Sequence, residues 1–310
     1  MCGIFGIAST KSTRNKLYQG LMKLEYRGYD SSGISGTHIS SKLSTIKATG
    51  PIKNLRTKLT SLTRITTGIA HTRWATHGEA ILKNTHPHLS ENISIVHNGI
   101  IENYIELKSL LKKKGYLFKS DTDSEVISHL IHMNYKKTKN MESSIISTTK
   151  MLNGSYAIGC INTNYANTIF AACKGSPLII GKGVNENFIA SDITPILSDT
   201  KHYIPLDDDE FAKVTPSKIS IFNANKKTIS KKVKTSKINT EQASLTGHKH
   251  FMHKEIYEQK SILKEMTSRY VGTSKILPNI FGPGTDKILE GIDHIHFVAC
   301  GTSYHASLVA

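Results

Sequence analysis

Residues 1–9 read MCGIFGIAS, and this opening stretch decides how the rest of the chain is interpreted. Residues 2–9 form a short apolar run, which predicts a buried β-strand. Because methionine aminopeptidases remove Met1 before a small residue, we expect the mature chain to begin with Cys2. Its α-amino group, with a reference pKa of about 7.7–8.0, is then the nearest base for its own thiol. A nucleophile paired with its own terminal amine is a known catalytic device, although a cysteine at position 2 is by itself more often incidental.

Length and composition are those of an ordinary globular protein. The 310 residues and 34.3 kDa are enough for one large domain or two ordinary ones. No stretch approaches the ~20 consecutive apolar residues of a membrane helix, and the start lacks the features of a signal peptide, so we expect no membrane association. The cysteines lie far apart without a CxxC pair, which argues against a disulfide framework or a zinc ribbon and favours a reducing cytoplasm. They are Cys2, Cys160, Cys173 and Cys300.

The chain is strongly basic, with a formal net charge of +16 and a pI of about 9.5. Lysine supplies most of the positive charge, whereas side chains that read nucleic-acid grooves and phosphates are more often arginine. The lysines are scattered, and no aromatic residues are interleaved with them as they are on a surface that stacks bases. We therefore interpret the excess charge as solvated surface and expect no nucleic-acid partner.

Helical and strand-like patterns alternate along the first 222 residues. Leu17, Leu21 and Leu24 recur at helical spacing and predict a helix within residues 14–28. Because strands cluster in runs between paired helices, α+β layering fits better than strict βαβ alternation. Further helices are predicted within 103–115, 124–137 and 141–154, and strands within 34–40, 44–50, 66–74, 93–101, 155–162, 167–174, 177–183 and 188–192.

The pattern changes after about residue 222, which we take as the end of a first domain spanning 2–222. Residues 223–250 are polar, rich in lysine and without apolar periodicity, which predicts a last strand or hairpin and then a linker. Residues 251–266 look helical, and residues 292–310 read as a strand, a glycine turn and the start of a helix. A lone strand and a partial helix cannot close a core, so we expect the domain at 251–310 to be incomplete.

Four further segments follow MCGI in order, and together with it they are specific: LEYRGYDSSGI (24–34), GIAHTRWATHGE (68–79), VHNGIIENY (96–104) and SDTDSEVISHL (120–130). The set resembles the class II, or N-terminal-nucleophile, glutamine amidotransferases over essentially residues 2–310. YRGYD resembles the branch that makes glucosamine 6-phosphate and glutamate from fructose 6-phosphate and L-glutamine. The resemblance implies a four-layer αββα sandwich followed by the start of an α/β sugar-isomerase domain, no cofactor, and a homodimer for a full-length member.

The resemblance gives Cys2 a reaction. Its thiol would attack the side-chain amide of glutamine, release ammonia and form a γ-glutamyl thioester that water hydrolyses. The α-amino group of Cys2 would shuttle the proton. The tetrahedral intermediate carries an oxyanion that needs fixed donors. Asn98 offers a side-chain NH₂ group, and Gly99 offers a backbone N–H that no Cβ shields.

The resemblance also places the charged end of glutamine. Arg73 can bind the α-carboxylate through its forked guanidinium, and Asp123 can accept hydrogen bonds from the α-ammonium. Thr76 and His77 would lie beside the substrate on a loop that closes over it. Without this context, Arg73 and Asp123 would be read as surface ion-pair partners, and Asn98-Gly99 as a type I′ hairpin turn.

Other residues of the motifs are implied to support the site. Trp74 resembles the gate to an ammonia channel, and Arg27 with Gly28 would organise the backbone around Cys2, whereas Asp30 could simply turn or cap the chain. Five histidines close in sequence suggest a metal cluster: His71, His77, His86, His88 and His97. No carboxylate or thiol stands at typical ligand spacing, so we expect no metal site.

The segment ACGTSYHAS at 299–307 resembles the first phosphate loop of a sugar-isomerase domain. Thr302 and Ser303 are therefore candidates for binding the phosphate of fructose 6-phosphate at a helix N-terminus. Two positions depart from the family pattern, since Lys260 replaces a proline and Cys173 an arginine. The resemblance corresponds to the front half of a family member, so we expect these residues to hydrolyse glutamine without forming glucosamine 6-phosphate.

Three alternatives stay open. A phosphoribosyl amidotransferase of purine synthesis shares the nucleophile, but it would normally read HRGQD where this chain has YRGYD at 26–30. A non-catalytic sugar-phosphate sensor would not need Cys2, Asn98 and Asp123 together. An inactive, truncated fragment is the third alternative.

Overall fold

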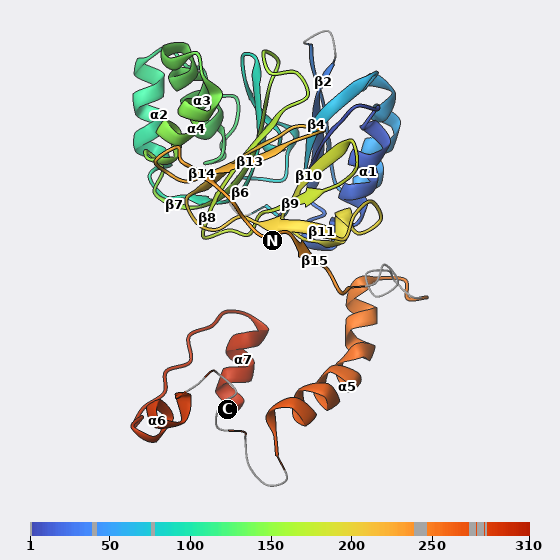
Figure 1. Cartoon of the computed structure of the whole chain (residues 1–310), viewed down its shortest axis with the longest axis vertical. Coiled ribbons are helices and arrows are strands. Elements are labelled where there is room, and N and C mark those ends of the chain that lie inside the picture. Colours follow the sequence, from blue (N-terminus) through green and yellow to red (C-terminus); the bar gives the residue numbers. More distant parts are fainter. Residues whose placement is uncertain are drawn as a thin grey trace. The chain divides into compact units, whose positions relative to one another are not determined.

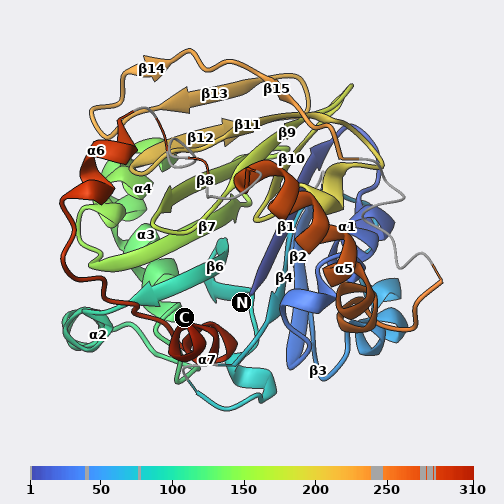
Figure 2. The same cartoon turned by 90° about the horizontal axis from the view of Figure 1, so that it is seen from below.

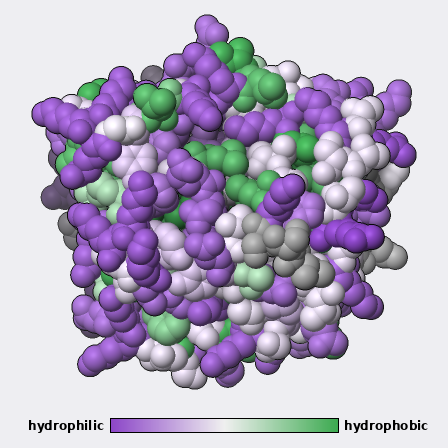
Figure 3. Space-filling model, turned by 90° about the horizontal axis from the view of Figure 1, so that it is seen from above, coloured by the Kyte–Doolittle hydropathy of each residue, from purple (hydrophilic) through white to green (hydrophobic). Residues whose placement is uncertain are grey.

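The computed structural model describes residues 2–38, 42–75, 78–238, 247–272, 277, 282 and 284–310. The chain forms two compact units, Met1–Ser244 and Leu245–Ala310. Within the described ranges, none of the helices combines the length and the apolar character that a membrane crossing requires. Hydrophilic side chains dominate the face of the molecule in Figure 3, where apolar ones form small separate groups.

Two β-sheets form the centre of the first unit, and every pairing between their strands is antiparallel. The first sheet has the spatial order β15 (Lys234–Thr235), β11 (His202–Pro205), β9 (Ile179–Lys182), β10 (Glu186–Ala190), β1 (Gly3–Ser9), β4 (Ile65–Arg73), β2 (Ser31–His38) and β3 (Leu43–Thr49). The second has the order β14 (Thr228–Ile229), β13 (Ile219–Phe222), β12 (Glu210–Val214), β8 (Ile169–Lys174), β7 (Gly154–Asn162), β6 (Ile93–Ile101) and β5 (His88–Ser90).

Helices cover the outer faces of the two sheets, as Figures 1 and 2 show. Helix α1 (Arg14–Met22) packs on the first sheet, and α2 (Tyr104–Lys113), α3 (Glu125–Thr138) and α4 (Met141–Thr149) pack on the second. Short 3₁₀ helices complete the unit at Glu25–Arg27, Ile52–Ser61, Leu82–Asn84 and Thr194–Ile196. The result is the four-layer αββα sandwich predicted from the sequence.

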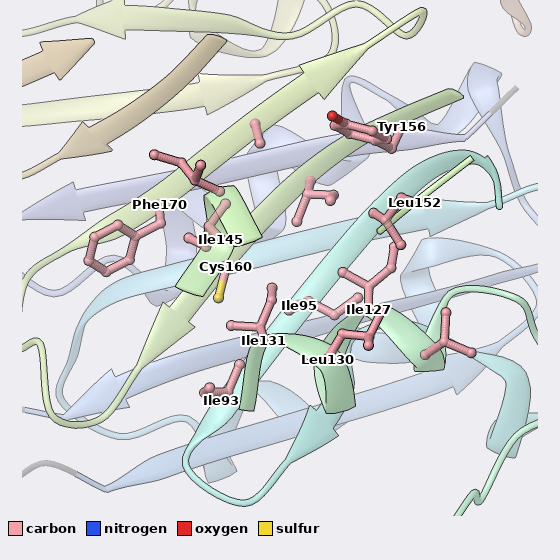
Figure 4. Close-up of a cluster of buried hydrophobic side chains, with 14 of the residues drawn as sticks. Ile93, Ile95, Ile127, Leu130, Ile131, Ile145, Leu152, Tyr156, Cys160 and Phe170 are labelled. Atoms are coloured by element: carbon pink, nitrogen blue, oxygen red, sulfur yellow. The ribbon is translucent and has the colours of Figure 1, made fainter. Parts of the chain in front are cut away.

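Successive side chains of a strand point to opposite faces of its sheet, and the apolar ones form three hydrophobic layers. In β1, Ile4 and Ala8 face the second sheet, whereas Phe5 and Ile7 face α1. All seven residues of β1 are buried, because the strand has a covered layer on both of its faces. A third layer lies between the second sheet and helices α2–α4, and Figure 4 shows Leu130 and Ile131 of α3 pointing into it. The predicted buried strand at 2–9 is confirmed.

The polar segment after residue 222 contains the hairpin predicted there and one further short strand. β14 pairs with β13 as a hairpin, and β15 pairs with β11 at the edge of the other sheet. The sequence analysis did not predict β11 or β12, because these short strands carry little apolar alternation. The helix predicted within 141–154 ends at Thr149, and Gly154 instead begins β7.

The second unit contains three helices in its described part, α5 (Phe251–Tyr270), α6 (Thr285–Glu290) and α7 (Thr302–Val309). The predicted helices at 251–266 and after Gly301 are present. The strand predicted near 292–299 is not formed, and the described part of this unit offers no other strand with which it could pair. Apolar side chains of α5, such as Leu263, are exposed, and none of the three hydrophobic layers includes a described residue of this unit.

Candidate active site

Cys2 precedes β1, which lies between β10 and β4 in the interior of the first sheet. Its thiol lies against the backbone of Trp74, directly after β4, with the Trp74 N–H directed at Sγ over 3.4 Å and the Trp74 carbonyl oxygen 3.6 Å from Sγ. Burial raises the pKa of the Cys2 thiol, and the Trp74 N–H and the positive charge of Arg73 offset only part of this effect. The thiol is therefore protonated at neutral pH and needs a base before it can attack.

Asn98 and Gly99 lie within β6, where they pair with Ala157 and Tyr156 of β7, so they are not a hairpin turn. The Asn98 Nδ2 atom donates to the carbonyl oxygen of Cys2 over 3.0 Å, which fixes the amide beside the nucleophile. Gly99 has a φ of +130°, and a Cβ there would lie 2.1 Å from the carbonyl oxygen of Ser155. Both proposed oxyanion donors thus come from one strand end next to Cys2.

Arg73 and Asp123 are buried, with 3% and 5% of their surfaces exposed, so neither is a surface ion-pair partner. The guanidinium of Arg73 donates to the carbonyl oxygens of Gly78 over 2.8 Å and Glu79 over 3.0 Å. The Asp123 carboxylate accepts a hydrogen bond of 2.8 Å from the backbone N–H of Ile101. These backbone contacts hold a positive charge at Arg73 and a negative charge at Asp123, which suit the α-carboxylate and the α-ammonium of an amino acid.

The segment 27–30 lies on the backbone that follows β4. Gly28 is packed so closely that a Cβ would lie 2.6 Å from the carbonyl carbon of Arg73. The Asp30 N–H donates to the Arg73 carbonyl oxygen over 3.1 Å, and the Asp30 carboxylate accepts from the Ala75 N–H over 2.8 Å. Arg27 anchors the segment by an ion pair with Asp192, in which Nη2 lies 3.2 Å from Oδ2. This frame fixes the backbone of residue 74, against which the Cys2 thiol lies.

Trp74 presents its indole to solvent, with 43% of its surface exposed. Its ring meets that of Tyr29 edge-on, with the ring centroids 5.5 Å apart. The role of Trp74 as a gate stays a prediction. Thr76 and His77, predicted beside the substrate, lie outside the described residues. Thr302 and Ser303 are the first two residues of α7 in the second unit, and both are exposed.

Several residues near Cys2 have contacts that the sequence analysis did not assign. Asp30 and Asp192 hold the segment 27–30 in place, and His71 contacts the oxygen of the Asn98 side chain at 3.0 Å. The YRGYD and HTRW motifs contain Asp30 and His71, so position within a motif was the available signal. Throughout the described ranges, no three histidine, cysteine, aspartate or glutamate side chains are grouped to hold a metal ion.

The comparisons with known proteins agree with this geometry. Residues 71–198 match the family model described as a glutamine amidotransferase domain. The chain is 42% identical over 316 residues to the glutamine–fructose-6-phosphate aminotransferase (isomerizing) of Buchnera aphidicola subsp. Baizongia pistaciae, covering 100% of this chain and 52% of that protein. The protein of the same name from Buchnera aphidicola subsp. Acyrthosiphon pisum is 42% identical over 314 residues, and the match covers 100% of this chain and 51% of that protein.

The chain thus spans about half the length of the curated relatives that it matches. Among solved structures, the glutamine phosphoribosylpyrophosphate amidotransferase of B. subtilis is similar, with a TM-score of 0.62 and 25% sequence identity over 73% of this chain and 50% of that one. The fold of the first unit is therefore that of N-terminal-nucleophile amidotransferases.

Proposed function

Because the chain belongs to the class II glutamine amidotransferase family, we propose that its first unit hydrolyses L-glutamine to glutamate and ammonia. The observation that carries the proposal is the hydrogen bond of 3.0 Å between Asn98 Nδ2 and the Cys2 carbonyl oxygen, which sets an oxyanion donor beside the thiol. Arg73 would bind the α-carboxylate, and Asp123 the α-ammonium, of the substrate. Thr76 and His77 are proposed to complete this pocket.

In the proposed reaction, removal of Met1 frees the α-amino group of Cys2, which takes the thiol proton. The sulfur then bonds to the amide carbon, and the carbonyl π-electrons move to the oxygen, where Asn98 Nδ2 and the Gly99 N–H would bind the negative charge. Collapse of the intermediate breaks the carbon–nitrogen bond, and the nitrogen takes the proton from the ammonium and leaves as ammonia. Water then cleaves the thioester, yielding glutamate and restoring the thiol.

We further propose that the ammonia serves the conversion of fructose 6-phosphate to glucosamine 6-phosphate, with Trp74 gating its path and Thr302 and Ser303 binding the sugar phosphate. The names of the relatives at 42% identity support this assignment. The four cysteines are free, which suits a reducing cytoplasm, and a homodimer is our expectation for a full-length member. Amination of phosphoribosyl pyrophosphate is the second candidate, favoured by the similarity of folds at 25% identity.

The test is to incubate the purified chain with L-glutamine and to measure glutamate and ammonia. We expect the two products in equal amounts, and none from the Cys2→Ser variant, whose weaker nucleophile has the same size. Fructose 6-phosphate added to the reaction should yield no glucosamine 6-phosphate, because these residues span about half the length of the relatives of that name. No glutamate from the wild-type chain would overturn the proposal.

A further inference from the structure

The side chain of Asn98 is fixed at both ends. Its Nδ2 atom donates to the Cys2 carbonyl oxygen over 3.0 Å, and its Oδ1 atom lies 3.0 Å from Nε2 of His71 in β4. An asparagine amide has donors on one side and an acceptor on the other, so a half turn about its last bond would exchange them. Only the observed orientation presents the NH₂ group toward the nucleophile.

His71 selects that orientation because its own tautomer is fixed. Its Nε2 atom also lies 3.0 Å from the backbone carbonyl oxygen of His97, which can only accept a hydrogen bond. Nε2 must therefore carry the proton and donate it. The Asn98 atom facing Nε2 must then be the oxygen, since an NH₂ group there would meet a second donor.

The surroundings of His71 keep the ring neutral and in place. The side chain is fully buried, and burial lowers its pKa to about 3, against the opposing effect of its hydrogen bonds to Asn98 and His97. The ring lies on that of His86, with the centroids 4.1 Å apart. Within the described residues Nδ1 has no hydrogen-bond partner, so Nε2–H is the only polar group through which the ring acts.

We propose that His71 is a positioning residue for the glutamine reaction, which holds Asn98 so that its NH₂ group faces the oxyanion. The inference rests on the proposed glutaminase function and adds a residue outside the substrate pocket. The second N–H of Asn98 Nδ2, the one not used by the Cys2 carbonyl, is then aimed at the reacting carbonyl oxygen. His71 itself touches neither the substrate nor the reacting atoms.

Two polar substitutions of similar size test the proposal. In His71→Gln the terminal amide nitrogen can reach the place of Nε2 and still donate to Asn98, whereas in His71→Asn the nitrogen falls near the place of Nδ1. We expect His71→Asn to lower the kcat for glutamine by about 10–100-fold, because complete loss of an oxyanion donor costs about 10²–10³-fold. KM should change little, since Arg73 and Asp123 are untouched. His71→Gln should retain most of the activity.

Two measurements separate positioning from a general structural effect. Alkylation of Cys2 by iodoacetamide needs no oxyanion donor, so its rate should be the same in His71→Asn and in the wild-type chain. In an Asn98→Ala background, His71→Asn should cause almost no further loss of kcat. His129→Leu, which removes a buried histidine bonded to Ser90 away from the site, is the matched control and should keep the wild-type kcat.

Equal kcat values for His71→Asn and the wild-type chain would overturn the role of His71. The role would also be overturned if the kcat losses of His71→Asn and Asn98→Ala multiplied in the double variant. Slower alkylation of Cys2 by iodoacetamide, in parallel with slower turnover in His71→Asn, would overturn it as well. An inactive wild-type chain would instead overturn the proposed function itself.

Discussion

Cys2 combines two properties that a nucleophile rarely has together, a protonated thiol and a position beside its own potential base. Burial raises the pKa of the thiol even though the Trp74 N–H and Arg73 act in the opposite direction. A histidine could serve as a base elsewhere, but His71 and His97 are used in hydrogen bonds within the buried interior. We therefore propose that the terminal amine takes the proton.

Replacement of the nucleophile gives the first prediction. Cys2→Ala should abolish glutamate formation and leave the fold intact, because the residue precedes β1 and its side chain packs in none of the three hydrophobic layers. Glutamate release and thermal unfolding measured on the same preparation check the two parts. Turnover at the wild-type rate in this variant would remove Cys2 from the mechanism.

The pH dependence tests the base. The amine is active when deprotonated, so kcat/KM should rise with pH and level off above the reference α-amino pKa of about 7.7–8.0. A chain that keeps Met1, verified by intact mass, should be nearly inactive because its Cys2 nitrogen is an amide. If the Met1-retaining chain turned over glutamine with the same pH profile, another group would have to be the base.

At the scale of elements, the long buried strands were predictable and the short ones were not. Strands such as β1 and β6 carry apolar residues on both faces, a pattern that the sequence displays directly. β11 and β15 are short strands at one end of the first sheet, and their positions depend on partners distant in the chain, since β11 pairs with β9 and β15 pairs with β11. Sequence motifs identified four of the proposed site residues: Asn98, Gly99, Arg73 and Asp123. The contact between His71 and Asn98 joins strands β4 and β6, so it becomes visible only in the folded structure.

The end of β6 is sensitive to any side chain at Gly99. Gly99→Ala should lower the free energy of unfolding by roughly 2–4 kcal/mol, because the φ of +130° disfavours a Cβ that would lie 2.1 Å from the Ser155 carbonyl oxygen. Gly115→Ala is the control, since its φ is +85° but nothing lies within 4 Å of the added Cβ. Urea unfolding measures both, and equal losses would mean that backbone conformation, not the contact with Ser155, dominates.

Glu125, the first residue of α3, allows a prediction of how the stability of the fold depends on pH. Burial alone would raise the pKa of Glu125, but the nearby imidazole of His129, 3.6 Å away, and hydrogen bonds from the Lys119 N–H and from the N–H and hydroxyl of Ser120 hold that pKa at about 2. A carboxylate with a depressed pKa stabilises the fold above its unfolded pKa, and the effect is lost as the pH falls through the folded value. Glu125→Gln should therefore cost about 1–3 kcal/mol at pH 7, and the difference from wild type should shrink from about pH 4.5 downward. Urea unfolding at several pH values checks this, and a pH-independent difference would contradict it.

At the scale of the first unit, residues 228–235 connect the edges of the two sheets. β14 extends the second sheet and β15 extends the first, as the upper part of Figure 2 shows. Between them, Lys231 forms ion pairs with Asp207 at 2.8 Å and Glu210 at 2.7 Å, on the segment that runs from β11 to β12. Residues 228–235, called the strap below, thus join one edge of each sheet within the first unit.

Removing the central contact of this strap should loosen the whole sandwich. We expect Lys231→Met to lower the free energy of unfolding by about 1–3 kcal/mol, because the substitution leaves Glu210 largely buried without its cation. The side chains of Lys231 and Glu210 are only 14% and 11% exposed, so salt screens the pair weakly. Lys174→Met is the matched control, because its pair with Asp209 spans 4.0 Å between half-exposed side chains and should contribute less than about 0.5 kcal/mol. Urea unfolding of both variants at low and high salt measures the difference. Equal losses would show that the ion pairs of Lys231 do not hold the strap to the sandwich.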